Sequence, residues 1–182
     1  MIFVTDADGQ CIYLSKDWTR LTGQKAEAAL GQGFYNAINP DDREMVRETR
    51  EAAIKIGAEY SLRYRLIKPD GTYRWIGAGG VPSFGMEDNR FIGYLGSITE
   101  LAEGATDTIT AYGNIERFVP PAPHPATMPS CDLDMIADHL IMAHSLIERD
   151  GGKEALPDLR KALFKIGQAL ATRTKELTRK LN

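Results

Sequence analysis

The chain has 182 residues, of which 43% are hydrophobic and 26% are charged, and its formal net charge is −3. This length suits one domain of about 100–150 residues with an appendage, and the small negative charge gives no electrostatic reason to expect a nucleic-acid partner. Because no run of about 18 apolar residues is present and the first residues lack the basic start and apolar core of a secretory signal, we expect a cytoplasmic protein without a membrane span.

The first sixty residues predict two short strands followed by helices. The strands are Ile2 to Thr5 and Cys11 to Leu14, joined by a turn at Asp6-Ala7-Asp8-Gly9-Gln10. The helices end at glycines or at Asn39-Pro40, and they comprise a turn carrying Trp18 and Leu21, then Lys25 to Leu30, Phe34 to Ile38, and Asp41 to about Ile56.

Three longer strands follow the last of these helices. From Tyr60 to Leu66 apolar and polar residues alternate, which is typical of a half-buried strand. Pro69-Asp70-Gly71 predicts a reversal, and Tyr73 to Phe84 and Phe91 to Leu101 are the next strands. We therefore expect an α+β protein with a five-stranded antiparallel sheet and short helices on one face.

The order of these elements and several short sequences resemble the PAS domain, a sensory fold, with its attached PAC region. The matching sequences span about 100 residues, and they are Trp18-Thr19-Arg20-Leu21-Thr22-Gly23, Ala29-Leu30-Gly31, Ile38-Asn39-Pro40-Asp41-Asp42-Arg43, Tyr64-Arg65-Leu66, Pro69-Asp70-Gly71-Thr72-Tyr73-Arg74-Trp75 and Phe91 to Glu100. The family usually has His where Asn39 stands and Asp where Ser97 stands.

The remainder of the chain predicts a connector and a helical hairpin. We assign residues 1–103 to the PAS domain, 104–130 to a proline-rich connector with a short helix near Ala111 to Arg117, and 131–182 to the hairpin. The second hairpin helix carries apolar residues at steps of three and four, which predicts an interaction surface on the PAS sheet or on a second chain, formed by Leu156, Leu159, Leu163, Ile166, Leu170 and Leu177.

The PAS resemblance implies a cavity between the inner face of the sheet and the short helices. Its expected lining is apolar and aromatic: Phe3, Ile12, Trp18, Leu30, Phe34, Tyr35, Ile38, Ile54, Tyr60, Leu62, Trp75, Ile76, Phe91 and Tyr94. Such residues are by default a filled core, and a ligand requires a real void with a few convergent polar groups.

Two cofactors of the family conflict with the residue types present. The flavin-binding branch uses a cysteine in a short helix, and Gly31-Gln32-Gly33-Phe34-Tyr35 contains no thiol. Haem-binding relatives use an axial histidine from the helix before the third strand, and Asp41 to Gly57 contains none. We expect no cofactor and no metal, with an unidentified small apolar ligand as the open alternative, and Cys11 as a buried thiol.

Two further features bear on partners. Gly77, Gly79 and Gly80 in the second long strand predict the close approach of a neighbouring helix or a partner to the sheet, with simple packing or a bulge as the alternative. His139 and His144 are the candidates for phosphotransfer, but ordinary surface or boundary histidines are the commoner interpretation, since neither has the flanking sequence of a kinase dimerisation helix.

We therefore expect a non-catalytic signalling protein that resembles stand-alone bacterial PAS regulators of two-component pathways. It would act by protein–protein contact, with a sensor histidine kinase or as a homodimer. The alternatives are a small-molecule sensor that uses the PAS cavity, and histidine phosphotransfer through the C-terminal helices.

Overall fold

The computed structural model describes residues 1–102 and 110–181, with the backbone alone at 175 and 177–181. The sheet has six antiparallel strands in the order β2-β1-β5-β4-β3-β6. The strands are β1 (Ile2–Thr5), β2 (Cys11–Leu14), β3 (Tyr60–Ile67), β4 (Tyr73–Phe84), β5 (Phe91–Glu100) and β6 (Tyr112–Asn114).

Short helices cover the inner face of the sheet. They are α1 (Asp17–Thr22), α2 (Ala26–Ala29), the 3-10 helices η1 (Gly33–Ala37) and η2 (Pro40–Asp42), and α3 (Arg43–Ile56). The α3 helix ends where Gly57 adopts a φ of 62°, which a residue without Cβ takes at no steric cost. The α+β fold with the short helices on one sheet face is confirmed.

The predicted reversal between β3 and β4 is also confirmed. The carboxylate of Asp70 accepts hydrogen bonds from the backbone N–H and the hydroxyl of Thr72, and Gly71 adopts a φ of 81°. This turn fixes the register in which Leu62 pairs with Ala78. Both side chains therefore belong to the inner core.

The described part of the segment expected to be a connector, from residue 110 onward, packs against the sheet. The predicted helix near Ala111 to Arg117 is wrong, because Tyr112–Asn114 forms β6, the sixth strand, beside β3. Phe118 follows, with 2% of its side chain exposed. A Cβ added to Gly79 would lie 2.2 Å from the Phe118 ring, and one added to Gly77 would lie 2.4 Å from Pro121. The glycines of β4 thus allow the chain's own connector to lie on the outer sheet face.

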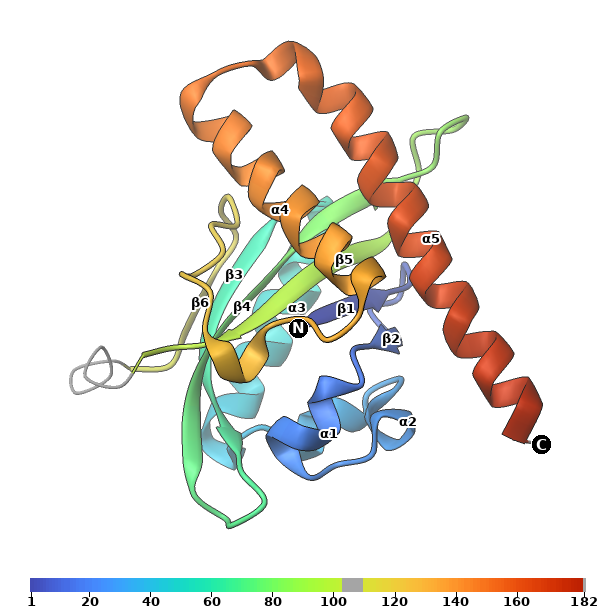
Figure 1. Cartoon of the computed structure of the whole chain (residues 1–182). Coiled ribbons are helices and arrows are strands. Elements are labelled where there is room, and N and C mark those ends of the chain that lie inside the picture. The colour runs from blue at the N-terminus through green and yellow to red at the C-terminus, as the bar shows by residue number, and fades with distance from the viewer. Residues whose placement is uncertain (103–109, 182) are drawn as a thin grey trace.

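The C-terminal helices α4 (Asp132–Asp150) and α5 (Leu156–Leu181) cross that same outer face, opposite α3 (Figure 1). They bury a second apolar cluster with the outward residues of the sheet: Ile2, Val4, Val81, Leu95, Phe118, Ala137, Ile141, Leu163 and Leu170. The hairpin therefore packs on the sheet of its own chain, which settles a choice that the sequence left open.

This packing changes the interpretation of the predicted interaction surface. Leu156, Leu163 and Leu170 are buried within the chain, and Leu159 and Ile166 pack beside them. These five residues therefore do not form a surface that is free for a partner. The side chain of Leu177 lies outside the described residues.

Buried polar contacts fix the start of α4. The Asp134 carboxylate, 2% exposed, accepts hydrogen bonds from the Tyr13 hydroxyl at 2.6 Å and the Ser15 hydroxyl at 2.8 Å. Asp17 accepts one from the backbone N–H of Ser130 at 3.2 Å. Such charge-assisted bonds are stronger than neutral ones, so they tie the hairpin to β2 and α1. Within the described residues, no helix is both long and apolar enough to span a bilayer.

A buried histidine lies where the hairpin meets the end of α3. The His144 side chain is 1% exposed, and its Nδ1 atom is 3.8 Å from the Glu59 carboxylate. Arg160 of α5 donates to its Nε2 atom at 3.4 Å, and Glu59 accepts a hydrogen bond from the Phe118 N–H at 2.7 Å. Burial, reinforced by Arg160 and Arg117 and opposed by Glu148, lowers the pKa of His144. Burial raises the pKa of Glu59.

Phe118→Ala should destabilise the protein by about 3–5 kcal/mol, because the substitution leaves a cavity over the glycines of β4. Urea denaturation measures the change in the free energy of unfolding. Val119→Ala is the matched control, since Val119 is 52% exposed, and we expect a change below about 0.5 kcal/mol. Equal effects of the two substitutions would contradict the docking of the connector.

The lowered pKa of His144 predicts a loss of stability in mild acid. The unfolded imidazole binds a proton below a pH of about 6.5 while the folded one resists it, so this contribution is present above that pH and is lost as the pH falls. Glu59 acts in the opposite direction, because its raised pKa favours the folded state in acid. Thermal unfolding of His144→Gln, compared with wild type, isolates the histidine.

Between a pH of about 7.5 and about 5.5, wild type should lose more stability than His144→Gln. The control His139→Gln should behave as wild type, because the His139 ring is exposed in the folded chain. Parallel pH profiles for wild type and His144→Gln would rule out this role for His144.

Candidate functional site

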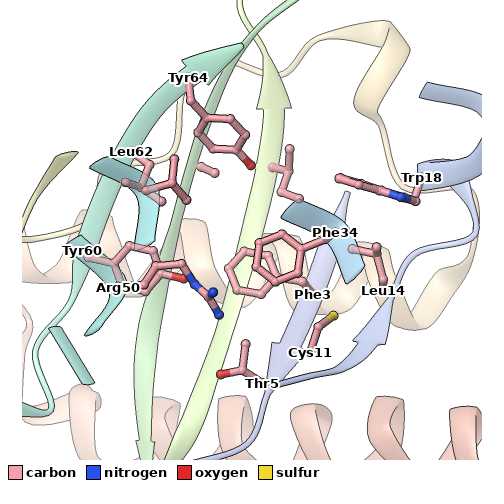
Figure 2. A pocket seen from close by; sticks show the side chains of 13 residues that line it. Phe3, Thr5, Cys11, Leu14, Trp18, Phe34, Arg50, Tyr60, Leu62 and Tyr64 are labelled. Carbon is pink, nitrogen blue, oxygen red and sulfur yellow. The ribbon is translucent and has the colours of Figure 1, made fainter. Parts of the chain in front are cut away.

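A cavity lies between the inner face of the sheet and the short helices. Side chains from β1, β2, β3, β4, β5, α1, η1 and α3 line it (Figure 2): Phe3, Thr5, Cys11, Leu14, Trp18, Phe34, Val46, Arg50, Tyr60, Leu62, Tyr64, Ala78 and Ile98. Its volume is about 40 Å³, counted as the space open to the centre of a water-sized sphere. About 10–15 Å³ by this measure holds one water, so a ligand larger than a few waters requires side chains to move.

Few of the described residues that line the cavity are polar, and Arg50 is the only charged one among them. Burial raises the pKa of the Cys11 thiol to about 12, so Cys11 is a neutral thiol and a poor nucleophile. Burial also raises the pKa of Tyr60 and of Tyr64, which are therefore neutral phenols. A cavity lined by apolar side chains, a neutral thiol and neutral phenols is suited to binding a small molecule by shape and hydrogen bonds.

The structure places the residues that we predicted for the cavity in three groups. Phe3, Trp18, Phe34, Tyr60 and Leu62 line the cavity itself. The second group belongs to the inner core or packs against it without lining the cavity: Leu30, Tyr35, Ile38, Ile54, Ile76, Phe91 and Tyr94.

Two of the predicted cavity residues lie elsewhere, and for these two the prediction is wrong. Ile12 packs into the outer cluster under the hairpin. Trp75 packs beside Arg65, whose guanidinium carbon is 5.6 Å from the centre of the indole. Side chains alternate along a strand, so the inward position of Ile76 turns Trp75 away from the cavity.

Sequence reasoning missed the charged residue of the cavity. Arg50 is 7% exposed and lies on the same face of α3 as Val46 and Ala53, at helical steps of four and three. Its guanidinium donates to the Gly9 carbonyl at 2.7 Å and to the Tyr35 hydroxyl at 2.9 Å. The sequence signal that could have found Arg50 is its position on the apolar stripe of the helix, between Val46 and Ala53. An arginine at such a position needs a partner, because arginine is rarely buried without one.

The described residues give less support to phosphotransfer and to a metal site. His144 is buried, which hinders phosphotransfer at that ring. The exposed His139 ring forms a hydrogen bond through Nδ1 to the Met135 carbonyl at 2.7 Å. Within residues 1–102 and 110–181, no group of three His, Cys, Asp or Glu side chains is placed to share a metal ion. The absence of flavin and of His-ligated haem remains a prediction. The thiol that lines the cavity is that of Cys11 on β2, which lies outside the Gly31 to Tyr35 segment where flavin-binding relatives have their cysteine.

Comparisons with known proteins agree with this architecture. Residues 11–98 match the family model described as the PAS fold. A curated relative, the uncharacterized protein y4lL of Sinorhizobium fredii, is 36% identical over 103 residues, which cover 57% of this chain and 12% of the relative. The chain thus matches only a small part of that relative's length.

Among solved structures, the N-terminal domain of a diguanylate cyclase with PAS/PAC sensor from Marinobacter aquaeolei matches with a TM-score of 0.50 at 16% identity, covering 54% of this chain and 92% of that one. The PAS domain of a protein from Colwellia psychrerythraea is 29% identical with a TM-score of 0.46, covering 55% and 84%. The segment 11–98 of this chain thus matches the PAS family model, and the structure has the PAS fold.

Proposed function

We propose that this chain is a non-catalytic sensor in which a small molecule occupies the inner cavity and the C-terminal hairpin relays the signal. The observation that carries the proposal is that single strands contact both the cavity and the hairpin. On β1, Phe3 faces the cavity while Ile2 and Val4 lie in the outer cluster. On β5, Ile98 faces the cavity and Leu95 lies in the outer cluster.

The β4 strand has the same two-sided arrangement. Ala78 faces the cavity, and Gly77 and Gly79 on either side lie beneath Pro121 and Phe118. A ligand that displaces the inner side chains must shift these strands, because close-packed interiors transmit strain. The outer contacts then change, and the ligand's differential affinity for the two arrangements sets the size of the response.

Native mass spectrometry of freshly purified protein tests this function. We expect a retained small molecule on wild type and its loss from Ala78→Leu, because the larger side chain fills the cavity. Ala143→Leu on α4 is the matched control, since Ala143 does not line the cavity, and it should retain the molecule. Stripping the molecule should lower the midpoint of thermal unfolding of wild type, since a ligand stabilises the state that binds it. Bare protein mass from all three samples would rule the sensing function out.

We propose protein contact through α4 as a second candidate function. Met135 and Leu146 are 42% and 43% exposed, and with Met142 they stand at i, i+7 and i+11 on one side of the helix. Methionine-rich surfaces adapt to helical partners. A second copy of the chain is the proposed occupant. A sensor histidine kinase stays a partner predicted from the architecture alone.

Size-exclusion chromatography with light scattering tests the self-association. Wild type should show twice the chain mass of 20.1 kDa, and the double variant Met135→Glu, Leu146→Glu should show the monomer mass. The control Ile56→Glu changes a residue that is 67% exposed on α3, and it should leave the dimer intact. A monomeric wild type at all concentrations would refute the proposed dimer.

A further inference from the structure

An open pocket of about 420 Å³ adjoins the inner cavity, between α3, η1 and the β1–β2 turn. Three arginines of α3 line it at i, i+4 and i+7, which places them along one side of the helix: Arg43, Arg47 and Arg50. We refer to it as the arginine pocket. Its other lining residues are Asp8, Gly9, Gln32, Tyr35, Glu51 and Ile54.

The buried member of this set, Arg50, lines the arginine pocket and the inner cavity alike. Figure 2 shows its guanidinium lying near Tyr60 and Phe34, and its central carbon is 4.8 Å from the centre of the Phe34 ring. Within the described residues Arg50 has neutral hydrogen-bond partners and no carboxylate, although it is only 7% exposed. A buried charge is costly unless an opposite charge meets it, so this position favours an anion.

The exposed member, Arg47, has no hydrogen bond or ion pair to any residue that the structure describes. Arg43 donates to the carbonyls of Ile38 at 3.0 Å and Asn36 at 3.3 Å, so its role is partly structural. Two exposed carboxylates, of Asp8 and Glu51, share the pocket with these three arginines, which leaves a formal charge of 3 − 2 = +1. That balance favours a monoanion over a polyanion.

We infer that the arginine pocket binds a small organic carboxylate with an apolar body. The carboxylate accepts hydrogen bonds from Arg47 and Arg50, whose planar guanidiniums match its two oxygens. The apolar body lies against Tyr35 and Ile54, which line the same pocket. This inference goes beyond the sensing function proposed above, because it places a second ligand site beside the inner cavity, with Arg50 shared between the two. Because Arg50 also faces the inner cavity, a ligand held there acts on the side chains that pack against the sheet.

Isothermal titration calorimetry with phenylacetate, and with phenylacetamide as its uncharged counterpart, tests the inference. Arg47→Gln removes one cation without removing any described hydrogen bond, so the fold should be unaffected. Lys55→Gln is the matched control, because it makes the same charge change at an exposed position of α3 outside the pocket. We expect Arg47→Gln to weaken phenylacetate binding about tenfold, which is typical for a hydrogen bond between charged groups. Lys55→Gln should weaken it less than about twofold, because exposed charges at a distance are screened.

The possible outcomes separate this inference from the sensing function. Equal affinity for phenylacetate and phenylacetamide overturns the carboxylate class and leaves sensing intact. Equal losses in Arg47→Gln and Lys55→Gln overturn the site, because they reveal only a general attraction to a basic surface. Absence of phenylacetate binding up to its solubility limit also overturns the inference, whereas the sensing function fails only if native mass spectrometry finds no retained molecule.

Discussion

The contact between Phe118 and the glycines of β4 is the constraint on which the rest of the structure depends. Gly77 and Gly79 have no side chains, so the connector lies on the sheet with the ring of Phe118 almost fully buried. The outer face of a half-buried sheet exposes apolar side chains unless something covers it. Here Phe118 and the helices α4 and α5 of the same chain pack on this outer face (Figure 1). The sheet is thereby buried on both faces.

Burial on both faces gives the strands contacts on two sides. Alternate residues of β1, β4 and β5 contact the cavity on one side and the hairpin on the other, with no intervening layer. The hairpin is also tied to the PAS domain by polar contacts of α4, through Asp134 near its start and through His144, whose Nδ1 atom is 3.8 Å from the Glu59 carboxylate. A change of shape in the inner core therefore has a short path to the helices, which supports the proposed relay.

The fold of the first hundred residues was accessible from the sequence because local rules agree with one another there. Alternation in Tyr60 to Leu66, the Pro69-Asp70-Gly71 turn and the glycine after α3 each specify their own element. What the sequence concealed depends on contacts between distant residues. The three residues of β6 carry too weak a strand signal to be recognised, and they pair only because β3 presents a free edge. Likewise, the glycines of β4 indicated a close approach, but which segment approaches is decided by the position of Phe118.

The candidate site was predictable to a similar extent. The aromatic lining by Phe3, Trp18, Phe34 and Tyr60 follows from the resemblance and from residue type. Ile12 was assigned to the wrong face, because a four-residue edge strand gives too little alternation to fix its orientation. Arg50 was overlooked because a charged residue on a helix is normally expected in solvent, and its burial appears only when the β1–β2 turn and Tyr35 are placed against it.

Amide hydrogen exchange across the whole chain tests most directly the central claim that the sheet and the hairpin form one packed unit. The account predicts that the central amides of α4 open with a free energy similar to that of the amides of β4 and β5, since these elements share one apolar cluster. Rapid exchange throughout α4 and α5 beside a protected sheet would show that the hairpin is not held on the outer face, and would contradict the account.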